Sequence, residues 1–201
     1  MTIKLIGSSS GSVSIDAPAS TTSGADITFK LPVADGSSGQ ALTTNASGQL
    51  AFATVGGANS PCWHGSQDTS QSISSATWTV MKNFADDAVN IGSGWDESEG
   101  RFTCQSGDAG IYYIFGYAGM TNMDDGDNIQ ARFTKNGSLY GATTIFFQRQ
   151  GNSPMSAMSH IIVSLTTNDY VELEMKHNEG SAEPTGAAYT SIGGYKLIGI
   201  S

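Results

Sequence analysis

The stretch of sequence that decides the fold is AGIYYIFGYAGM, at residues 109–120. Successive side chains of a strand point to opposite faces, so the odd-numbered positions from Ile111 to Tyr117 share one face, and Tyr112 and Ile114 share the other. Both faces are then apolar, which a strand with one side in water would not tolerate. The pattern predicts a strand with one face in the core of a β sandwich. The opposite face is covered either by a neighbouring subunit or by loops of the same chain.

The residues around this stretch repeat the β pattern. Segments rich in β-branched and aromatic residues alternate with turn signals, and no ten-residue stretch has the 3.6-residue period of an amphipathic helix. Strands are expected at 62–67, 76–84, 99–105, 109–122, 127–135, 139–149, 155–166, 169–177 and 188–200. So many strands in about 140 residues favour an all-β sandwich or jelly roll.

Composition divides the chain into two parts. Of its aromatic residues only Phe29 and Phe52 precede residue 61, and a Gly-rich junction lies just before that point. We therefore expect an extended N-terminal arm of strands and turns at 1–57 and a head domain at 58–201. The arm has too few large apolar side chains to offset the entropy of ordering its backbone, so it needs a partner surface or sister copies of itself.

Several motifs of the head occur in an order that resembles one family. They are GRFTC at 100–104, GIYYIF at 110–115, ARFTKNG at 131–137, IIVSL at 161–165 with NDYVEL at 168–173, and SIGGYKLI at 191–198. Together they resemble the C1q/TNF-like globular heads, which are ten-stranded jelly rolls that assemble as trimers. The chain departs from the family near its end, because Ile192 stands where the family has an aromatic residue and the aromatic residue, Tyr195, follows the glycines.

The resemblance implies a homotrimer. Taken with the two apolar faces of the strand at 109–119, it makes four residues the candidate trimer interface: Ile111, Tyr113, Phe115 and Tyr117. It also implies that the head is a binding or structural domain and not an enzyme.

A second resemblance lies in the arm. The segment LPVADGSSGQALTTNASGQLAFAT at 31–54 resembles a segment of the fibre and surface proteins of tailed bacteriophages that precedes distal receptor-like or knob domains. It implies a virion protein whose residues 1–57 dock on other capsid or tail proteins and whose head is displayed on the virion surface, after assembly in the host cytoplasm. A trimeric capsid decoration or head-fibre protein is the leading interpretation. A short tail fibre, or a module that binds a host receptor or glycan, is the alternative.

Charge and hydropathy exclude other classes of protein. The formal net charge is −9, the isoelectric point is near 4.5, and the nine basic residues are scattered. Nucleic acids and anionic membranes both require clustered Lys and Arg, so neither is an expected partner. The apolar runs are only a few residues long, so we expect no membrane insertion and no signal peptide.

The sequence carries no catalytic motif. It has no G-x-S-x-G elbow, Walker loop or H-E-x-x-H zinc motif, so neither catalytic residues nor a cofactor are expected. The acidic loop with Asp124, Asp125 and Asp127 is the one candidate metal site, because Ca²⁺ prefers carboxylate and carbonyl oxygens. A solvated turn between strands is favoured over a Ca²⁺ site here.

Two pairs of residues leave alternatives open. Cys62 and Cys104 are interpreted as two buried thiols, and a disulfide is the alternative. Trp78 and Trp95 are interpreted as core residues, and a platform on which a sugar ring stacks is the alternative.

Overall fold

The computed structural model describes residues 3–6, 12–15, 26–45, 47, 49–54, 59–85, 89–121, 123–147 and 154–197. The chain divides into two compact units, Met1–Val55 and Gly56–Ser201. Within the described ranges, no helix has both the length and the apolar character needed to cross a membrane.

The described residues of the first unit form two hairpins. β1 (Ile3–Ile6) pairs antiparallel with β2 (Ser12–Ile15), and β3 (Gln40–Thr44) pairs antiparallel with β4 (Leu50–Thr54). The second hairpin lies within residues 31–54 of the arm, for which strands and turns are expected.

Asn45 forms the turn of this hairpin. Its side-chain oxygen accepts hydrogen bonds from the backbone N–H groups of Ser47 and Gln49, at 2.9 and 3.2 Å. An Asn side chain that bonds backbone groups two and four residues on takes the place of a backbone turn. Around the hairpin the large apolar side chains are exposed, among them Ile27, Phe29, Leu31 and Val33. The described residues around this hairpin therefore bury little apolar surface.

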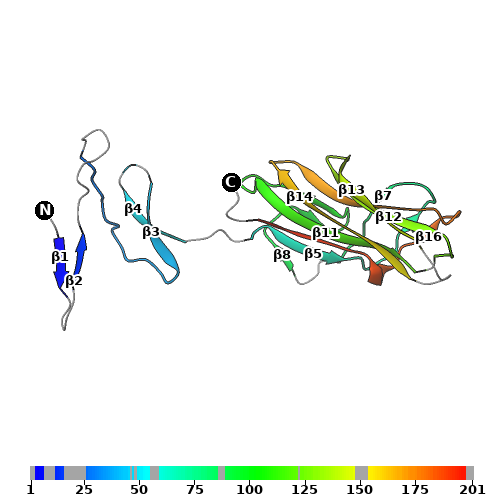
Figure 1. The fold of residues 1–201 in the computed structure, drawn as a ribbon, viewed down its shortest axis with the longest axis horizontal. Coiled ribbons are helices and arrows are strands. Elements are labelled where there is room, and N and C mark those ends of the chain that lie inside the picture. The colour runs from blue at the N-terminus through cyan, green and yellow to red at the C-terminus, as the bar shows by residue number, and fades with distance from the viewer. Residues whose placement is uncertain are drawn as a thin grey trace. The chain divides into compact units, whose positions relative to one another are not determined.

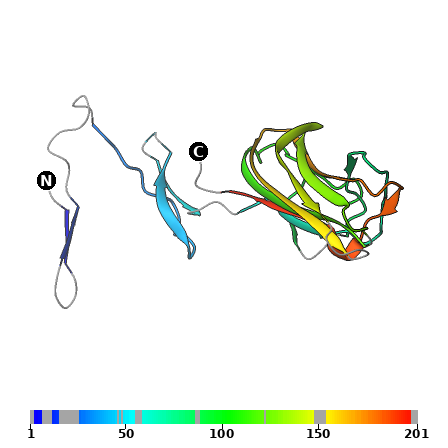
Figure 2. The ribbon, with the colours of Figure 1, turned by 45° about the vertical axis from the view of Figure 1, so that its right-hand side comes forward.

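The second unit contains two antiparallel sheets, shown in Figures 1 and 2. The first sheet has the order β14 (Met155–Leu165), β11 (Gly110–Met120), β17 (Ser191–Lys196), β5 (Cys62–Ser66) and β8 (Val89–Ile91). The second sheet has the order β13 (Ser138–Phe147), β12 (Asn128–Lys135), β15 (Tyr170–His177), β10 (Arg101–Thr103) and β9 (Trp95–Asp96), and β7 (Thr79–Val80) also pairs with β15. The remaining elements are the pair β6 (Ser72–Ile73) and β16 (Glu183–Pro184), and one 3₁₀ turn, η2 (Ala187–Tyr189).

The decisive stretch forms β11, a central strand of the first sheet. It pairs along its whole length with β14, from Gly110 opposite Leu165 to Met120 opposite Met155, and on its other edge with β17. Its even-numbered side chains, Tyr112 above all, are fully buried between the sheets. The odd-numbered side chains therefore point away from the core.

The core fills the space between the two sheets. Trp63 of β5 lies flat on Phe102 of β10, with ring centroids 3.9 Å apart, and Tyr112 packs against the same Phe102 ring at 5.4 Å. The buried Tyr112 hydroxyl donates a hydrogen bond to the Asp108 carbonyl oxygen at 2.6 Å, so its polar end has a partner. The largest fully buried side chains come from both sheets and from the segments between them: Tyr112, Phe102, Phe133, Ile73, Met81, Ile114, Met120, Met123, Ile129, Leu165, Leu173 and Met175.

The all-β jelly-roll prediction is confirmed. The long strands agree with their predicted ranges within one or two residues, where those residues are described, except that β17 begins three residues after the predicted start at 188, because 187–189 form η2. The predicted strand at 76–84 contains only β7. Ala76 and Asn83 have φ values of 56° and 61°, which end a strand on either side of β7. The prediction missed β6, β8, β9 and β16, which are two or three residues long and too short to show a period. The predicted strand ends at 122, 148–149 and 198–200 lie outside the described residues.

Candidate functional site

The candidate site is the outward face of the first sheet, which we call the outer face. Its members follow from the alternation of each strand, because the intervening residues point into the core. The register then places the outward residues of neighbouring strands side by side. They are Cys62, His64, Ser66, Val89, Ile91, Ile111, Tyr113, Phe115, Tyr117, Gly119, Ser156, Met158, His160, Ile162, Ser164, Ser191, Gly193 and Tyr195.

The outer face carries no Asp, Glu, Lys or Arg at any of these positions. The chain has 18 acidic and nine basic residues, so they are all excluded from the outward positions of five strands. The outward face of the second sheet, in contrast, carries charged side chains. There, Arg101 pairs with Glu172 and Arg132 with Glu174, both at 2.6 Å. The protein thus presents one charged sheet face and one uncharged sheet face.

Aromatic rings occupy the middle of the outer face. The Tyr113 ring lies near three others, with centroid distances of 6.1 Å to Phe115, 6.2 Å to His160 and 5.8 Å to Tyr195. Phe115 also lies parallel to the His64 ring at 6.3 Å, across the bare backbone of Gly193. A Cβ at Gly193 would come within 2.8 Å of Phe115 and 3.2 Å of His64, so only glycine leaves room for this arrangement.

All four predicted interface residues lie on the outer face. Ile111, Tyr113 and Phe115 are half-buried by their neighbours, and Tyr117 is exposed. Sequence reasoning did not find the rest of the face, above all Met158, His160 and Ile162 of β14, which lie directly opposite β11. Their spacing of two residues was visible in the sequence, but only the register shows which β14 side chains share a face with Tyr113.

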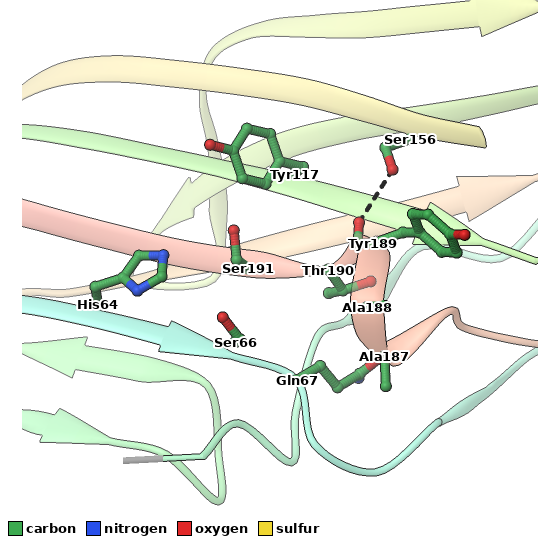
Figure 3. A pocket seen from close by; sticks show the side chains of 10 residues that line it. All are labelled: His64, Ser66, Gln67, Tyr117, Ser156, Ala187, Ala188, Tyr189, Thr190 and Ser191. Atoms are coloured by element: carbon green, nitrogen blue, oxygen red, sulfur yellow. Dashed lines mark hydrogen bonds between the residues drawn. The ribbon is translucent and has the colours of Figure 1, made fainter. Parts of the chain in front are cut away.

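A hollow of about 520 Å³ lies at one end of the outer face, where β17 meets η2 (Figure 3). Ser191 lies between Tyr117 and Ser66, and Tyr189 of η2 stands beside Ser156, whose hydroxyl donates a hydrogen bond to the Tyr189 carbonyl oxygen at 3.1 Å. Apart from His64, the lining has no ionisable side chain other than tyrosine. The hollow therefore extends the uncharged character of the face.

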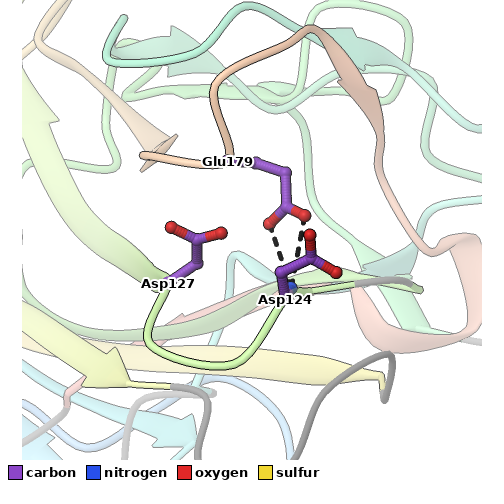
Figure 4. A group of neighbouring side chains, drawn as sticks. All are labelled: Asp124, Asp127 and Glu179. Carbon is purple, nitrogen blue, oxygen red and sulfur yellow. Dashed lines mark hydrogen bonds between the residues drawn. The ribbon is translucent and has the colours of Figure 1, made fainter.

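The acidic loop gathers a different set of carboxylates from the predicted one. Asp124 and Asp127 lie with Glu179, and one oxygen from each lies within 4.8 Å of the others, whereas the exposed Asp125 is not part of the group (Figure 4). The Glu179 carboxylate accepts the Asp124 backbone N–H at 3.2 and 3.3 Å, and burial together with the neighbouring carboxylates raises the pKa of Glu179. Ca²⁺ takes about six to eight oxygen ligands, so these three side chains supply only part of a shell. A solvated turn stays the prediction for this loop, with a Ca²⁺ site as its alternative.

The cysteines and tryptophans have separate environments. Cys62 and Cys104 are free thiols, the first half-buried on the outer face and the second fully buried, where burial raises the pKa of its thiol. Trp95 lies in the core against Phe84, as predicted. The core prediction for Trp78 is wrong, because its ring lies outside the second sheet. The Arg132 guanidinium is 3.9 Å from the ring centroid of Trp78, and the Lys176 ammonium is 5.0 Å from it.

Solved structures of other proteins have a fold similar to that of the second unit. Among solved structures, the globular domain of zebrafish complement 1qA protein aligns with a TM-score of 0.52 and 14% identity, over 68% of this chain and 97% of that chain. Eiger TNF from S. frugiperda aligns with a TM-score of 0.50 and 13% identity, over 68% of this chain and 91% of that chain. At these identities the likeness shows the fold alone.

No curated protein sequence matches the chain. A family model described as the C1q domain matches residues 66–197, which is more than half of the chain. The resemblance of the head to C1q/TNF-like domains is thereby confirmed, and the resemblance of residues 31–54 to bacteriophage proteins stays a prediction. The chain belongs to the C1q domain family.

Proposed function

We propose that this protein is a non-enzymatic structural and binding protein that assembles as a homotrimer through the outer face of its C1q-like head. The observation that carries the proposal is the absence of charged side chains from every outward position of the first sheet, in a chain with a net charge of −9. Charged residues are depleted at the centre of protein interfaces, and contiguous apolar patches are rare on monomers.

Burial of the exposed side chains of this face would contribute favourable free energy to an assembly. Ile162 is 63% exposed, Ile91 is 60% exposed and Met158 is 42% exposed. Full burial of one such side chain stabilises by roughly 1.5–3 kcal/mol. Each copy in a closed trimer covers part of this face, and the resemblance to C1q/TNF heads supports three copies rather than two.

The test is the mass of the full chain in solution. The wild type is expected to have three times the 20.9 kDa of one chain at micromolar concentration. Ile162→Glu places a carboxylate on a face that has no Asp, Glu, Lys or Arg, at an already exposed position of β14, so we expect folded monomers. Gln130→Glu is the matched control, because Gln130 lies on the second sheet opposite Lys176, where charges are already present, and it should remain a trimer. A wild-type monomer at micromolar concentration contradicts the assembly.

The role on a particle is the finer part of the proposal. Residues 1–57 dock on other virion proteins of a tailed bacteriophage, and the head is displayed outward, where it can meet a host surface. Support comes from the resemblance of residues 31–54 to phage fibre and surface proteins, and from the exposed apolar side chains of the first unit, such as Leu31 and Leu42. A trimer presents three arms together, and the effective concentration multiplies their affinity.

Imaging of particles tests this role. Electron microscopy with an antibody against the head should place the protein on the capsid or tail of purified particles, in copy numbers that are multiples of three. Leu42→Asp, on the arm, should reduce the amount on particles and leave the trimer mass unchanged, because it lies outside the head. Recovery of the wild-type protein only in the soluble fraction contradicts a virion role without affecting the assembly proposal.

A further inference from the structure

His160 is the exposed histidine at the middle of β14, on the outer face. It lies directly opposite Phe115, and its neighbours along the outward side of its own strand are Met158 and Ile162. Both neighbours are exposed apolar side chains, two residues away on either side. Any subunit that covers Met158, Phe115 and Ile162 must also cover the imidazole between them.

Among the described residues, the groups around His160 on this face include no carboxylate. From β11 the titratable groups are the phenols of Tyr113 and Tyr117, and from β17 the phenol of Tyr195. On β14 itself the other outward residues are serine, methionine and isoleucine. From η2 the titratable group is Tyr189, and Tyr140 of β13 lies at the edge of the core.

In the part of the chain that the structure describes, one ion pair reaches β14. Lys135 of β12 donates a hydrogen bond to the Ser164 carbonyl oxygen at 2.9 Å, and its ammonium is paired with Asp169 at 2.9 Å. This pair lies toward the end of the strand, four residues from His160. No carboxylate then remains at the described outward positions to accept a hydrogen bond from an imidazolium ion at His160.

We propose that His160 makes the trimer acid-labile, so that protonation of this imidazole releases the subunits. This rests on the proposed assembly through the outer face. Imidazole side chains in water gain a proton near pH 6.5, and the charged form is disfavoured in an apolar, water-excluded contact without a carboxylate. The free subunit thus binds a proton at His160 that the trimer does not bind.

The direction and the size of the effect of pH on trimer association follow from proton linkage. The trimer is favoured where His160 is neutral, above the pH at which the free subunit titrates, and it is weakened as the pH falls through that point. Three subunits take up three protons on dissociation. The association constant for three chains should therefore fall by up to about 1000-fold per pH unit in the acidic range.

Sedimentation velocity of the full chain between pH 8.0 and pH 5.5, at constant ionic strength, tests this. The wild type should be a trimer at pH 8.0 and should dissociate progressively below about pH 6.5. His160→Gln removes the titration and keeps a neutral side chain of similar size, so it should remain a trimer at pH 5.5. His160→Lys fixes a positive charge and should be a folded monomer already at pH 8.0. Thr77→Lys, in an exposed turn before β7, is the control for the added charge and should remain a trimer.

His64 is the second imidazole of the face, and His64→Gln separates the two contributions. This variant should retain the response to pH. The inference is overturned if acid strengthens the trimer, if wild type and His160→Gln dissociate in parallel, or if His64→Gln alone abolishes the response. A wild-type monomer at pH 8.0 instead overturns the assembly on which the inference rests. Carboxylate titration affects wild type and His160→Gln equally, so their difference reports His160.

Discussion

Asp169 joins two turns that are more than thirty residues apart in the sequence. Its carboxylate accepts hydrogen bonds from the Asn136 side chain at 2.8 Å and from the backbone N–H and hydroxyl of Thr166, and it pairs with Lys135. In return the Asn136 side-chain oxygen accepts the Tyr170 backbone N–H at 2.9 Å. These bonds, first that from Asn136, hold the pKa of Asp169 well below its usual range. Only the ionised carboxylate can accept all of them.

Replacement of this carboxylate should destabilise the head in a pH-dependent way. A lowered folded-state pKa contributes stability above the unfolded-state value, and that stability is lost as the pH falls through the folded-state value. Asp169→Asn should therefore lower the Tm by several degrees at pH 7 and at pH 5. The difference in Tm between wild type and variant should become smaller only in strong acid. Thermal unfolding followed by circular dichroism measures it, with Asp68→Asn, an exposed carboxylate, as the control. A Tm difference between wild type and Asp169→Asn that is the same at every pH would contradict this explanation.

At this scale the sequence predicted the turn but not its partner. The motif KNG at 135–137 predicts positive φ values, and Asn136 and Gly137 have φ values of 52° and 74°. The bond to Asp169 depends on the pairing of β12 with β15, which is a long-range contact that local spacing does not encode.

At the scale of the element, Gly100 sets the start of β10. It has a φ of 64°, and a Cβ at this position would overlap the carbonyl oxygen of Met81 and lie 2.8 Å from the Phe84 ring. Gly107, after the same strand, also has a positive φ, of 91°, but nothing lies within 4 Å of its Cβ position. The two glycines therefore separate the cost of backbone conformation from the cost of a steric overlap.

Alanine at each glycine should give different losses of stability. Gly107→Ala should lower the free energy of unfolding by about 1 kcal/mol, because only the left-handed conformation is penalised. Gly100→Ala should lower it by about 3 kcal/mol or more, since the backbone of residue 81 must also move. Urea denaturation of both variants measures the difference. Equal losses would mean that the turn before β10 relaxes freely.

The identity of β11 as a buried strand was predictable from the hydrophobic pattern, whereas its odd-numbered face was assigned to the interface only together with the family resemblance. Both faces are apolar, so the hydrophobic pattern is symmetric about the strand. The two faces of β11 differ at Gly116, where a Cβ would lie 2.9 Å from Leu173 of the second sheet. The even-numbered face is therefore the one that the second sheet approaches closely, and the odd-numbered face is left outside.

At the scale of the whole molecule, the sequence predicted a chain of two parts. The scarcity of aromatic residues before Pro61 is a property of composition, which needs no contact information. Only β11, one of the five strands of the outer face, was identified with this face in advance, because the other four come from residues 62–66, 89–91, 155–165 and 191–196. Pairing between segments so far apart follows from topology and not from periodicity.

The separation of charge between the two sheets also affects the free subunit. Ion pairs cover the outside of the second sheet, whereas the outside of the first sheet has none of the four charged residue types. A single subunit thus has one charged sheet face, which water hydrates well, and one uncharged sheet face, which water hydrates less well. We expect such a subunit to collect at an air–water boundary with its uncharged side toward the air, and the proposed trimer to reduce this behaviour because it covers that side. Dilution of the protein below its association range should therefore make foaming and loss to vessel walls its main handling problem.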